Sequence, residues 1–511
     1  MKKHFLIKLA VLTLVITAYG CSSKDDTEQD PARVGTVTIN PIATDDVIDA
    51  NESTQATHTI SGTAIGGSIE ADDSVIVAVN GASYTTIVEA NGIYSVEVAT
   101  NDLLLDNSVD VSVVSNIGAG NSVTSKASRT ITVNTSTGTK TFVHPGLLVK
   151  QSDFDRIKSK VNAGTEPWVS GWNKLTSNTH ASLSYNPNPV VKLIRGGNSL
   201  EESDPDNYGN AFNDTAAAFQ CAIRWKVTGD TAYADKATQI LNEWASTCTS
   251  LSGDPNIGLL GIYGYQFANA AEIMRTYEGW SSADFEAFKT WMTNLFYPLS
   301  KDLLDTHYGT CSTFLWASWD LLSLANIMSI AVLTDDQEKY DYTINYLKTG
   351  IGNGNLNRAI NYIHPNGLGQ LQESGRDQGH TLLSVGLLGE IAQMAYSQGD
   401  DIFGYDDNRI LKGAEYAAKY NVANLGVPFE SYNNCDNANH TVVSGDARGN
   451  VRPIWDLLYY HYVVRKGLTS QYLKFAAEAY GSIEGGGGDY GPNSGGFDSL
   501  GFGTLLYAIE E

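Results

Sequence analysis

Residues 370–395 read QLQESGRDQGHTLLSVGLLGEIAQMA, a polar stretch that passes directly into an apolar one. The apolar half has the length and composition of a buried helix. If the helix includes the polar half, Glu373, Arg376 and His380 lie at i, i+3 and i+7 and share one face. Polar groups beside a buried helix need partners or a purpose. A carboxylate, a cation and a titratable ring on one face therefore predict a functional site.

Apolar residues recur at helical spacing along most of the chain after residue 144. The predicted helices cover residues 153–161, 214–227, 233–245, 265–275, 283–295, 314–333, 341–350, 381–397, 408–420 and 451–464. Breaks such as Gly229-Asp230 are typical of turns between helices. Ten or so helices with mostly short connections predict a mainly α fold, in which helix pairs close into an α/α toroid. A helical solenoid is the alternative, but no fixed repeat period supports it.

Residues 34–135 follow a different pattern, with short alternating runs rich in Val, Thr and Ile. Runs such as Val75 to Val79 and Val109 to Val113 are separated by turn residues such as Asn80-Gly81. This pattern predicts an immunoglobulin-like β-sandwich, and no cluster in it suggests chemistry. The predicted domains are a lipoprotein signal peptide over 1–20, a tether over 21–33, the sandwich over 34–135 and the toroid over 141–511.

The N-terminus indicates where the protein goes. Lys2 and Lys3 precede an apolar run that ends at Gly20-Cys21, and the run is too short to span a membrane. The segment resembles a bacterial lipoprotein signal, with Cys21 as the lipidated residue. We expect an outer-membrane lipoprotein on the cell surface, with the periplasmic face as an alternative and the lipid anchor as its contact with the membrane. An ordinary secreted protein is the other reading.

Composition limits the partners and the redox chemistry. The chain has 511 residues and a net charge of −24, which argues against a nucleic-acid partner, because phosphate binding needs a basic face. An anionic sugar is still possible, since a few cations in a cleft set the local field. None of Cys221, Cys248, Cys311 and Cys435 has CxxC spacing, so we expect no zinc or redox motif. Cys221 and Cys248 either form a disulfide or remain free.

Over residues 144–511 the chain resembles the alginate-lyase-like polysaccharide lyases. The resemblance is carried by FLWASWDL (314–321) with IAVLTDD (330–336), by GQLQESGRDQGH (369–380), and by RGNVRPIW (448–455) with FDSLGFGT (497–504). It implies an α/α-toroid enzyme that cleaves alginate (poly-mannuronate) or a related β-1,4-polyuronate by β-elimination. An anionic polysaccharide of the alginate or glucuronan type is the implied partner. We expect no cofactor, no metal and a monomer.

Two features depart from the family pattern. Better-known alginate lyases carry an Asn-Asn-His triplet before the central helix, where this chain has Cys311-Ser312-Thr313. The nearest histidine is His307. The family's arginine is followed two turns later by a tyrosine, whereas Leu382 and Leu383 follow Arg376. The acid and the base must therefore be assigned from this chain's own residues.

Elimination from a uronate needs a group that neutralises the carboxylate, a base and an acid. We assign Arg376 as the neutraliser, with a structural ion pair to Glu373 as the alternative. His380 and His307 are candidates for the base or for carboxylate contact, although a lone histidine is as often structural. Tyr362 is the predicted proton-shuttling tyrosine, with packing as its alternative role.

The rival tyrosines are Tyr308 and Tyr432. A further set of residues could bind the substrate and has capping, packing or ion pairing as the alternative: Glu373, Gln266, Asn269, Arg448, Arg452 and Trp316.

Two other classes of function remain open. One is a surface lipoprotein that binds glycans without catalysis, although a binding platform needs aromatic residues more than a base. The other is an α/α-toroid glycoside hydrolase, which needs two opposed carboxylic acids. Glu373, Asp377 and Asp320 are the candidates for that pair.

Overall fold

The computed structural model describes residues 33–49, 52–134, 140–254, 256–436, 438–479 and 483–510. The chain forms two compact units: residues 33–46, 56–103 and 108–131 make the first, and nearly all the other described residues make the second. The predicted signal peptide, most of the predicted tether and the predicted lipidation site Cys21 lie outside the described residues. The domain boundaries near residues 34, 135 and 141 stay predictions.

The first unit contains two antiparallel sheets. One has the order β1-β3-β6, from β1 (Thr36–Ile39), β3 (Thr57–Ile65) and β6 (Ile93–Ala99). The other has the order β5-β4-β7-β8, from β5 (Ala82–Ile87), β4 (Ser74–Val79), β7 (Ser108–Gly118) and β8 (Asn121–Thr130). Buried residues alternate with exposed ones along β3 and β4, as in a sheet with one face in the core. The region is strand-rich as expected, and its immunoglobulin-like classification stays a prediction.

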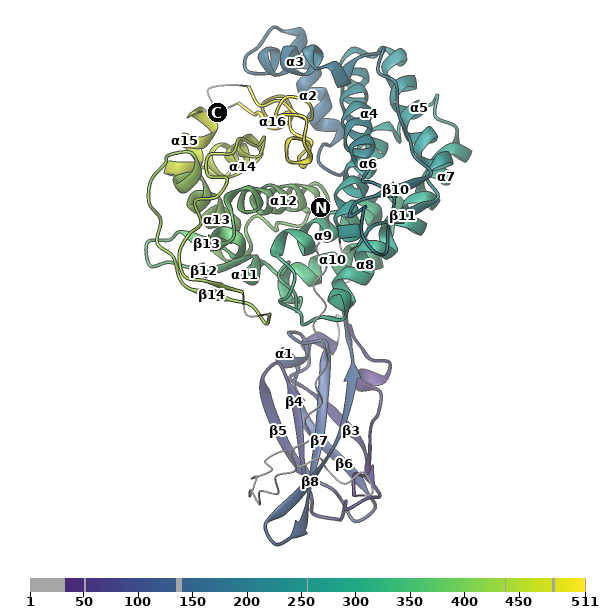
Figure 1. Ribbon diagram of the computed structural model, residues 1–511, viewed down its shortest axis with the longest axis vertical. Coiled ribbons are helices and arrows are strands. Elements are labelled where there is room, and N and C mark those ends of the chain that lie inside the picture. The colour runs from purple at the N-terminus through teal and green to yellow at the C-terminus, as the bar shows by residue number, and fades with distance from the viewer. Residues whose placement is uncertain are drawn as a thin grey trace, which may run out of the picture. The chain divides into compact units, whose positions relative to one another are not determined.

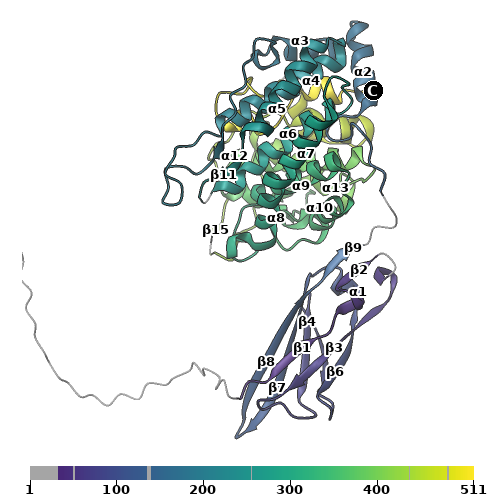
Figure 2. The same cartoon turned by 90° about the vertical axis from the view of Figure 1, so that its right-hand side faces the viewer.

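The second unit is helical, which confirms the mainly α prediction. Its helices of nine residues or more are α2 (Gln151–Asn162), α3 (Trp168–Ser177), α4 (Gly209–Thr228), α5 (Thr231–Thr247), α6 (Gly261–Met274), α7 (Ser282–Trp291), α8 (Tyr297–Thr306), α9 (Ala317–Thr334), α10 (Gln337–Thr349), α12 (Gln378–Ser397), α13 (Tyr405–Asn421) and α15 (Gln471–Ala479). Shorter ones include α11 (Leu356–Ala359), α14 (Trp455–Tyr459) and α16 (Gly503–Tyr507). All ten predicted segments contain a helix, whereas α3, α8, α11, α15 and α16 were not predicted. Figure 2 shows the pairs α4–α5, α6–α7 and α9–α10 stacked in sequence.

Neighbouring inner helices run in the same direction. Between α4 and α6, Thr215 contacts Gln266 near the starts of the helices and Lys226 contacts Thr276 near their ends. The pairs α6–α9 and α9–α12 behave alike, with Asn326 beside Gly264 and Met394 beside Ser329. Figure 1 shows α4, α6, α9 and α12 in the interior of this unit. The N-terminal ends of these helices therefore lie at one end of the toroid, and the C-terminal ends at the other.

The inner helices α6, α9 and α12 are almost wholly buried, as expected for core helices. Every residue of α6 is buried, and in α12 all residues but His380 and Tyr396 are. Among the described residues, α9 is the one helix long and apolar enough to cross a membrane, and 89% of it is buried within the protein. A polar side chain that stays accessible on such a helix is an exception that needs an explanation.

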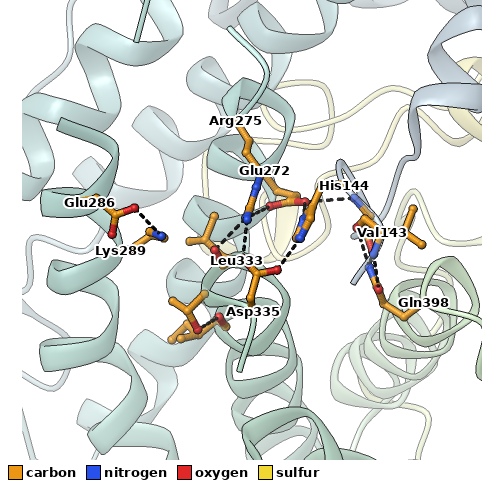
Figure 3. Close-up of polar contacts among 12 residues, drawn as sticks. Val143, His144, Glu272, Arg275, Glu286, Lys289, Leu333, Asp335 and Gln398 are labelled. Atoms are coloured by element: carbon orange, nitrogen blue, oxygen red, sulfur yellow. Dashed lines mark hydrogen bonds and ion pairs between the residues drawn. The ribbon is translucent and has the colours of Figure 1, made fainter. Parts of the chain in front are cut away.

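A charged network closes the C-terminal end of the toroid. His144 Nδ1 lies 2.6 Å from Glu272 Oε1 of α6, and its Nε2 lies 2.6 Å from Asp335 Oδ1 at the end of α9. Arg275 donates to Asp335 Oδ2 at 2.6 Å and to the carbonyl oxygen of Leu333 at 2.9 Å. Figure 3 shows His144 between the two carboxylates. The network joins the segment before α2 to the ends of α6 and α9, and we call it the latch.

Candidate active site

The polar stretch of residues 370–380 does not form one helix. It runs as strand β13 (Gly369–Leu371), a 3₁₀ turn over Gln372–Gly375, and then α12. The predicted continuous helical face is therefore wrong. The helix begins only after Asp377, because the Asp377 carboxylate accepts the His380 N–H at 2.8 Å and caps the helix there.

The side chains expected to share a face nevertheless meet. Arg376 Nη1 donates to Glu373 Oε2 at 2.7 Å, and Arg376 Nη2 lies 3.3 Å from His380 Nε2. The Arg376 guanidinium also lies over the ring of Trp316, 4.9 Å from its centroid. Trp316 precedes the first residue of α9, so the N-terminal ends of α9 and α12 together supply the cation, the histidine and an aromatic face.

His380 is the one histidine presented by the buried α12, and 41% of its side chain is exposed. Its Nδ1 lies 2.7 Å from Asp377 Oδ2, so Nδ1 carries a proton that it donates to the carboxylate. Burial opposes the ionisation of Asp377, but the hydrogen bonds from His380 and the charge of Arg376 hold its pKa below the ordinary value. Nε2 is then the nitrogen that accepts, and it faces Arg376.

Glu373 has a structural role instead of the predicted substrate contact. Its side chain is 0% exposed, and its Oε1 accepts the Ser318 N–H at 2.8 Å and the Ser384 hydroxyl at 3.1 Å. It therefore caps α9 and holds Arg376 in place. Arg376 therefore forms the ion pair with Glu373 that was its alternative role, but only through Nη1. Its Nη2 faces His380.

A short hairpin further along the chain also lies at the site. This hairpin was not predicted from the sequence. In it β14 (Tyr432–Asn433) pairs with β15 (Asn439–His440). Gln372 Nε2 donates to the Tyr432 hydroxyl at 2.8 Å, and the His440 ring lies 5.6 Å from the Trp316 ring. A Cβ on Gly375 would lie 2.5 Å from that of His440, so only glycine lets the hairpin approach this closely. Burial raises the pKa of Tyr432, which keeps its hydroxyl protonated.

A disulfide fixes this hairpin beside the start of α9. Cys311 is bonded to Cys435, with the two Cα atoms 6.3 Å apart and a sequence separation of 124. The Cys435 N–H also donates to Thr313 Oγ1 at 3.2 Å. The suggested Cys221–Cys248 disulfide is absent: both thiols are free and buried, and burial raises the pKa of Cys221 to about 12 and that of Cys248 to about 11.

Two further residues beside Tyr432 were not predicted. Asn353 donates to the carbonyl oxygens of Leu315 at 2.7 Å and Thr313 at 3.1 Å, and its side chain also contacts the Tyr432 hydroxyl. The positive charge of Arg358, in α11, acts on the same hydroxyl. Among the described residues Arg358 has no carboxylate within ion-pair distance, and it donates to the carbonyl oxygen of Ile351. Only its place in the Asn-rich run GNGNLNR (352–358) could have pointed to it.

His307 lies inside the protein and not on the accessible surface of the site. It is 2% exposed, and its Nε2 is 3.3 Å from the Tyr346 hydroxyl and 3.8 Å from Asp320 Oδ2. Asp320 is itself fully buried and accepts the Gly354 N–H at 2.8 Å. This buried network supports the turn that carries Asn353, so His307 is placed as a structural residue and not as the base.

Tyr362 and Tyr308 lie on other parts of the unit. Tyr362 is exposed on β12 (Ile360–Ile363), where it pairs with Gln370 and its ring lies 4.8 Å from that of His364. No contact between Tyr362 and Arg376 or His380 occurs among the described residues. Tyr308 packs against Trp319, with ring centroids 6.4 Å apart, and burial raises its pKa to about 12. Tyr432 is the tyrosine that the structure brings to Arg376 through Gln372 and Glu373.

The remaining predicted substrate-binding residues make internal contacts. Gln266 donates to the Phe497 carbonyl oxygen at 2.6 Å, and Asn269 accepts the Leu148 N–H at 3.1 Å; both side chains are buried. Arg452 is buried against Asp498 at 2.7 Å.

Arg448 donates to the carbonyl oxygens of Tyr420 and Leu425 and stacks over the Tyr420 ring at 3.8 Å. Gln266, Asn269, Arg452 and Arg448 therefore make the capping, packing or pairing contacts that were given as their alternative roles. Within the described part of the chain, no group of three or more His, Cys, Asp or Glu side chains could hold a metal ion.

Known proteins resemble parts of this chain. Residues 173–426 match the family model described as alginate lyase, a range that includes Trp316, Arg376 and His380. A comparison with curated protein sequences returned no match. This chain is 48% identical to a bacterial immunoglobulin-like domain from the M. primoryensis ice-binding adhesin, over 20% of this chain and 100% of that chain, with a TM-score of 0.20.

Solved alginate lyases share the helical fold. An apo form of alginate lyase A1-III, the enzyme of Sphingomonas species A1, is 15% identical with a TM-score of 0.50, covering 71% of this chain and 96% of that chain. An alginate lyase from Bacteroides ovatus is 15% identical with a TM-score of 0.49, covering 72% and 100%. At this identity the first of these likenesses concerns the fold alone. The family match identifies residues 173–426 of this chain as an alginate lyase domain, which makes the protein a polysaccharide lyase.

Proposed function

We propose that this polysaccharide lyase cleaves alginate, or a related β-1,4-polyuronate, by β-elimination between Arg376, His380 and Tyr432. The observation that carries the proposal is the 3.3 Å approach of His380 Nε2 to Arg376 Nη2 on a helix that is otherwise buried. A carboxylate bound to Arg376 would place the adjacent C5 of the sugar beside an oriented, accepting imidazole nitrogen. Neutralisation and proton abstraction would then occur at neighbouring atoms.

The groups divide the reaction between them. Arg376 neutralises the C6 carboxylate, which makes the C5 proton more acidic and stabilises the enolate-like charge that develops. His380 Nε2 removes the C5 proton, with Asp377 holding the ring and favouring the imidazolium that forms. The electron pair of the C5–H bond becomes the C4–C5 double bond as the C4–O4 bond breaks. The Tyr432 hydroxyl, kept protonated by burial, gives its proton to the departing O4.

The surroundings suit an anionic sugar despite the charge of −24. Arg376, Arg358 and His380 place positive or protonatable groups at this end of the toroid. Trp316 offers an aromatic surface of the kind on which sugar rings stack. Local cations set the field inside a cleft more strongly than distant surface carboxylates, which salt screens.

The hydrolase reading lacks its carboxylic acids. Glu373 and Asp320 are both fully buried, and Asp377 is engaged by His380 at 2.7 Å. Hydrolysis needs one protonated and one ionised carboxyl group facing the glycosidic bond. A protein that only binds glycans would not need the hydrogen bond by which Asp377 orients His380.

The export prediction becomes a proposal of its own. We propose that the chain is an outer-membrane lipoprotein at the cell surface, acylated at Cys21. The Cys311–Cys435 disulfide supports an oxidising compartment. Metabolic labelling with a fatty acid should mark the wild type and not Cys21→Ser; equal labelling of both would refute the anchor.

One experiment tests the assignment of the acid. Polyuronates are incubated with the wild type, Tyr432→Phe and the matched control Tyr362→Phe, and the absorbance of the unsaturated product is followed alongside reducing ends. Tyr432→Phe should lose about 10²–10⁴-fold in kcat with little change in KM, as for a lost general acid. Tyr362→Phe should keep a kcat near that of the wild type. The reverse result would restore the assignment to Tyr362, and reducing ends without unsaturation would indicate a hydrolase.

A further inference from the structure

A second arginine lies at the same end of the toroid as the candidate active site. Arg195 follows the strand β10 (Lys192–Ile194), and its Nη1 donates to the Tyr263 hydroxyl at 3.0 Å and lies 3.5 Å from the Leu259 carbonyl oxygen. Tyr263 lies in the first turn of α6. Because the inner helices are parallel, these N-terminal ends lie at the end that also carries Trp316 and Arg376.

The Arg195 guanidinium is flanked by two tyrosine rings. Its central carbon lies 4.8 Å from the Tyr208 centroid and 5.8 Å from the Tyr263 centroid. The two rings are nearly parallel, 10° apart in plane, with centroids separated by 6.3 Å. Tyr263 is buried, whereas Tyr208 and Arg195 are partly exposed. The stacking fixes the plane of the guanidinium and leaves donors free.

No carboxylate neutralises this cation. Among the described residues, Arg195 has no Asp or Glu oxygen within ion-pair distance, although the neighbouring loop is acidic. Glu202 pairs with Lys192 at 3.0 Å and accepts from the hydroxyl of Ser252. Asp206 accepts the backbone N–H groups of Gly196 and Gly197 at 2.7 and 2.8 Å. Glu202 and Asp206 are thus engaged by other partners, and a partly exposed arginine remains available for a carboxylate from outside.

Aromatic residues connect this arginine with the site. Trp319, one turn into α9 from Trp316, contacts Tyr308 with ring centroids 6.4 Å apart. The Tyr308 hydroxyl in turn lies against Gly258, in the turn whose Leu259 carbonyl oxygen faces Arg195. A polyuronate carries one carboxylate on every sugar. A chain that lies along these helix ends would therefore bring a second carboxylate to Arg195 while the first is held by Arg376.

We propose that Arg195 and Tyr208 form a second carboxylate-binding subsite, which grips a uronate of the same polysaccharide at a distance from the bond that breaks. The proposal rests on the proposed function. A contact made equally in the ground state and the transition state lowers KM without changing kcat. The subsite should therefore favour long chains over the shortest oligosaccharide that is cleaved.

The test compares two stacked arginines on the same unit. Arg224 also stacks over a tyrosine, Tyr233 at 3.9 Å, and donates to a backbone carbonyl oxygen, but it lies near the C-terminal end of α4. Arg195→Ala should raise KM for a long polyuronate roughly tenfold, the effect of losing one charge-assisted contact. Its kcat and its kinetics on the shortest cleaved oligosaccharide should stay near wild type. Arg224→Ala should change neither, and Arg195→Lys should recover part of the affinity.

Binding of the long polymer to the Tyr432→Phe protein, with and without Arg195→Ala, separates this proposal from the reaction. Weaker binding caused by Arg195→Ala supports the subsite even if the wild type forms no unsaturated product, an outcome that would refute only the lyase assignment. Equal binding of both proteins, or no binding at all, overturns the subsite. A loss of kcat on the shortest oligosaccharide, or a fall in thermal midpoint larger than that of Arg224→Ala, would make Arg195 a structural residue and also overturn it.

Discussion

The two ends of the toroid carry the same residue types in different arrangements. Each end has a network of one histidine, one arginine and two carboxylates: His380, Arg376, Asp377 and Glu373 at the N-terminal end, and His144, Arg275, Glu272 and Asp335 at the C-terminal end. In the latch both nitrogens of the ring face carboxylates. In the candidate active site one nitrogen faces a carboxylate and the other faces a guanidinium.

The partner of the second nitrogen decides what each histidine can do. His144 is clamped at 2.6 Å on both sides with its side chain 19% exposed, so it is held as a charged link between helix ends. His380 is 41% exposed, and its second nitrogen lies 3.3 Å from Arg376 Nη2 instead of facing a second carboxylate. Composition alone therefore does not distinguish a structural network from a reactive one; the placement of the charges does.

The comparison is tested most strongly by the two histidines. His380→Gln should lower kcat by about 10²–10⁴-fold, because it removes the base while retaining the shape of the side chain. His144→Gln should keep kcat near wild type and lower the thermal midpoint instead. Steady-state kinetics and thermal denaturation of both variants measure the two effects. If His380→Gln loses only stability, the N-terminal network is a second latch and the site lies elsewhere.

Substitutions of Arg376 and Arg275 should differ in the same way as those of the two histidines, but the expected changes in kcat are smaller. Arg376→Lys keeps the charge but loses the paired geometry for a carboxylate, so kcat should fall by about 10²–10³-fold. Arg275→Lys is the matched change in the latch, where the lost contacts are with Asp335 and the Leu333 carbonyl oxygen. It should lower the thermal midpoint with kcat unchanged. A change in KM alone for Arg376→Lys would contradict a role in the transition state.

The disulfide should affect the active-site end more than the latch end. The double variant Cys311→Ser, Cys435→Ser removes a link across 124 residues and should cost about 2–5 kcal/mol of unfolding free energy. Because the link fixes the hairpin of Tyr432, kcat on polyuronate should also fall while the protein is still folded. Denaturant unfolding and kinetics with and without a reductant measure both.

As a control, a reductant should lower the kcat of the wild type and should not change the kcat of the double variant. Cys221 and Cys248 are already free and buried, so they give the reductant no other target. An unchanged kcat in the folded double variant would mean that backbone contacts such as Cys435 N–H to Thr313 hold the hairpin without the bond.

The sequence predicted the features that depend on residues close to one another along the chain. Helical periodicity located the inner helices, and spacing over seven residues brought Glu373, Arg376 and His380 together, even though a turn and a capping residue replaced the continuous helix. It could not predict contacts between distant segments. Tyr432 and His440 reach the site through a short hairpin, and Cys311 pairs with Cys435 at a sequence separation of 124.

Burial explains the residues that were assigned wrongly. Gln266, Asn269 and Arg452 have the polar chemistry of a binding site, but their helices and loops are turned into the core, where such groups must satisfy each other. The direction in which a polar residue of a buried helix points depends on its neighbours, which one sequence does not reveal. His380, in the first turn of α12, is one of the two residues of that helix that are not buried.

The smallest expected effect is a pH dependence of stability that distinguishes the latch from the active-site network. Burial alone would lower the pKa of His144, but the hydrogen bonds and charges of Glu272 and Asp335 outweigh it and raise the pKa above its ordinary value. Burial likewise raises the pKa of Glu272. Both groups therefore hold protons more tightly in the folded state than in the unfolded chain, so unfolding free energy falls as pH rises.

The upward shift of the His144 pKa fixes the pH range in which its stabilising contribution is lost. Its stabilising contribution is complete below the unfolded value of about 6.5 and is lost as pH rises through the raised folded value. His144→Gln should therefore lower the thermal midpoint more at pH 6 than at an alkaline pH, by a difference that adds to the variant's pH-independent loss of contacts. The wild type measured at the same pH values is the control. If His144→Gln lowers the thermal midpoint equally at both pH values, His144 is not held as a charged link, and the contrast between the two ends rests on exposure alone.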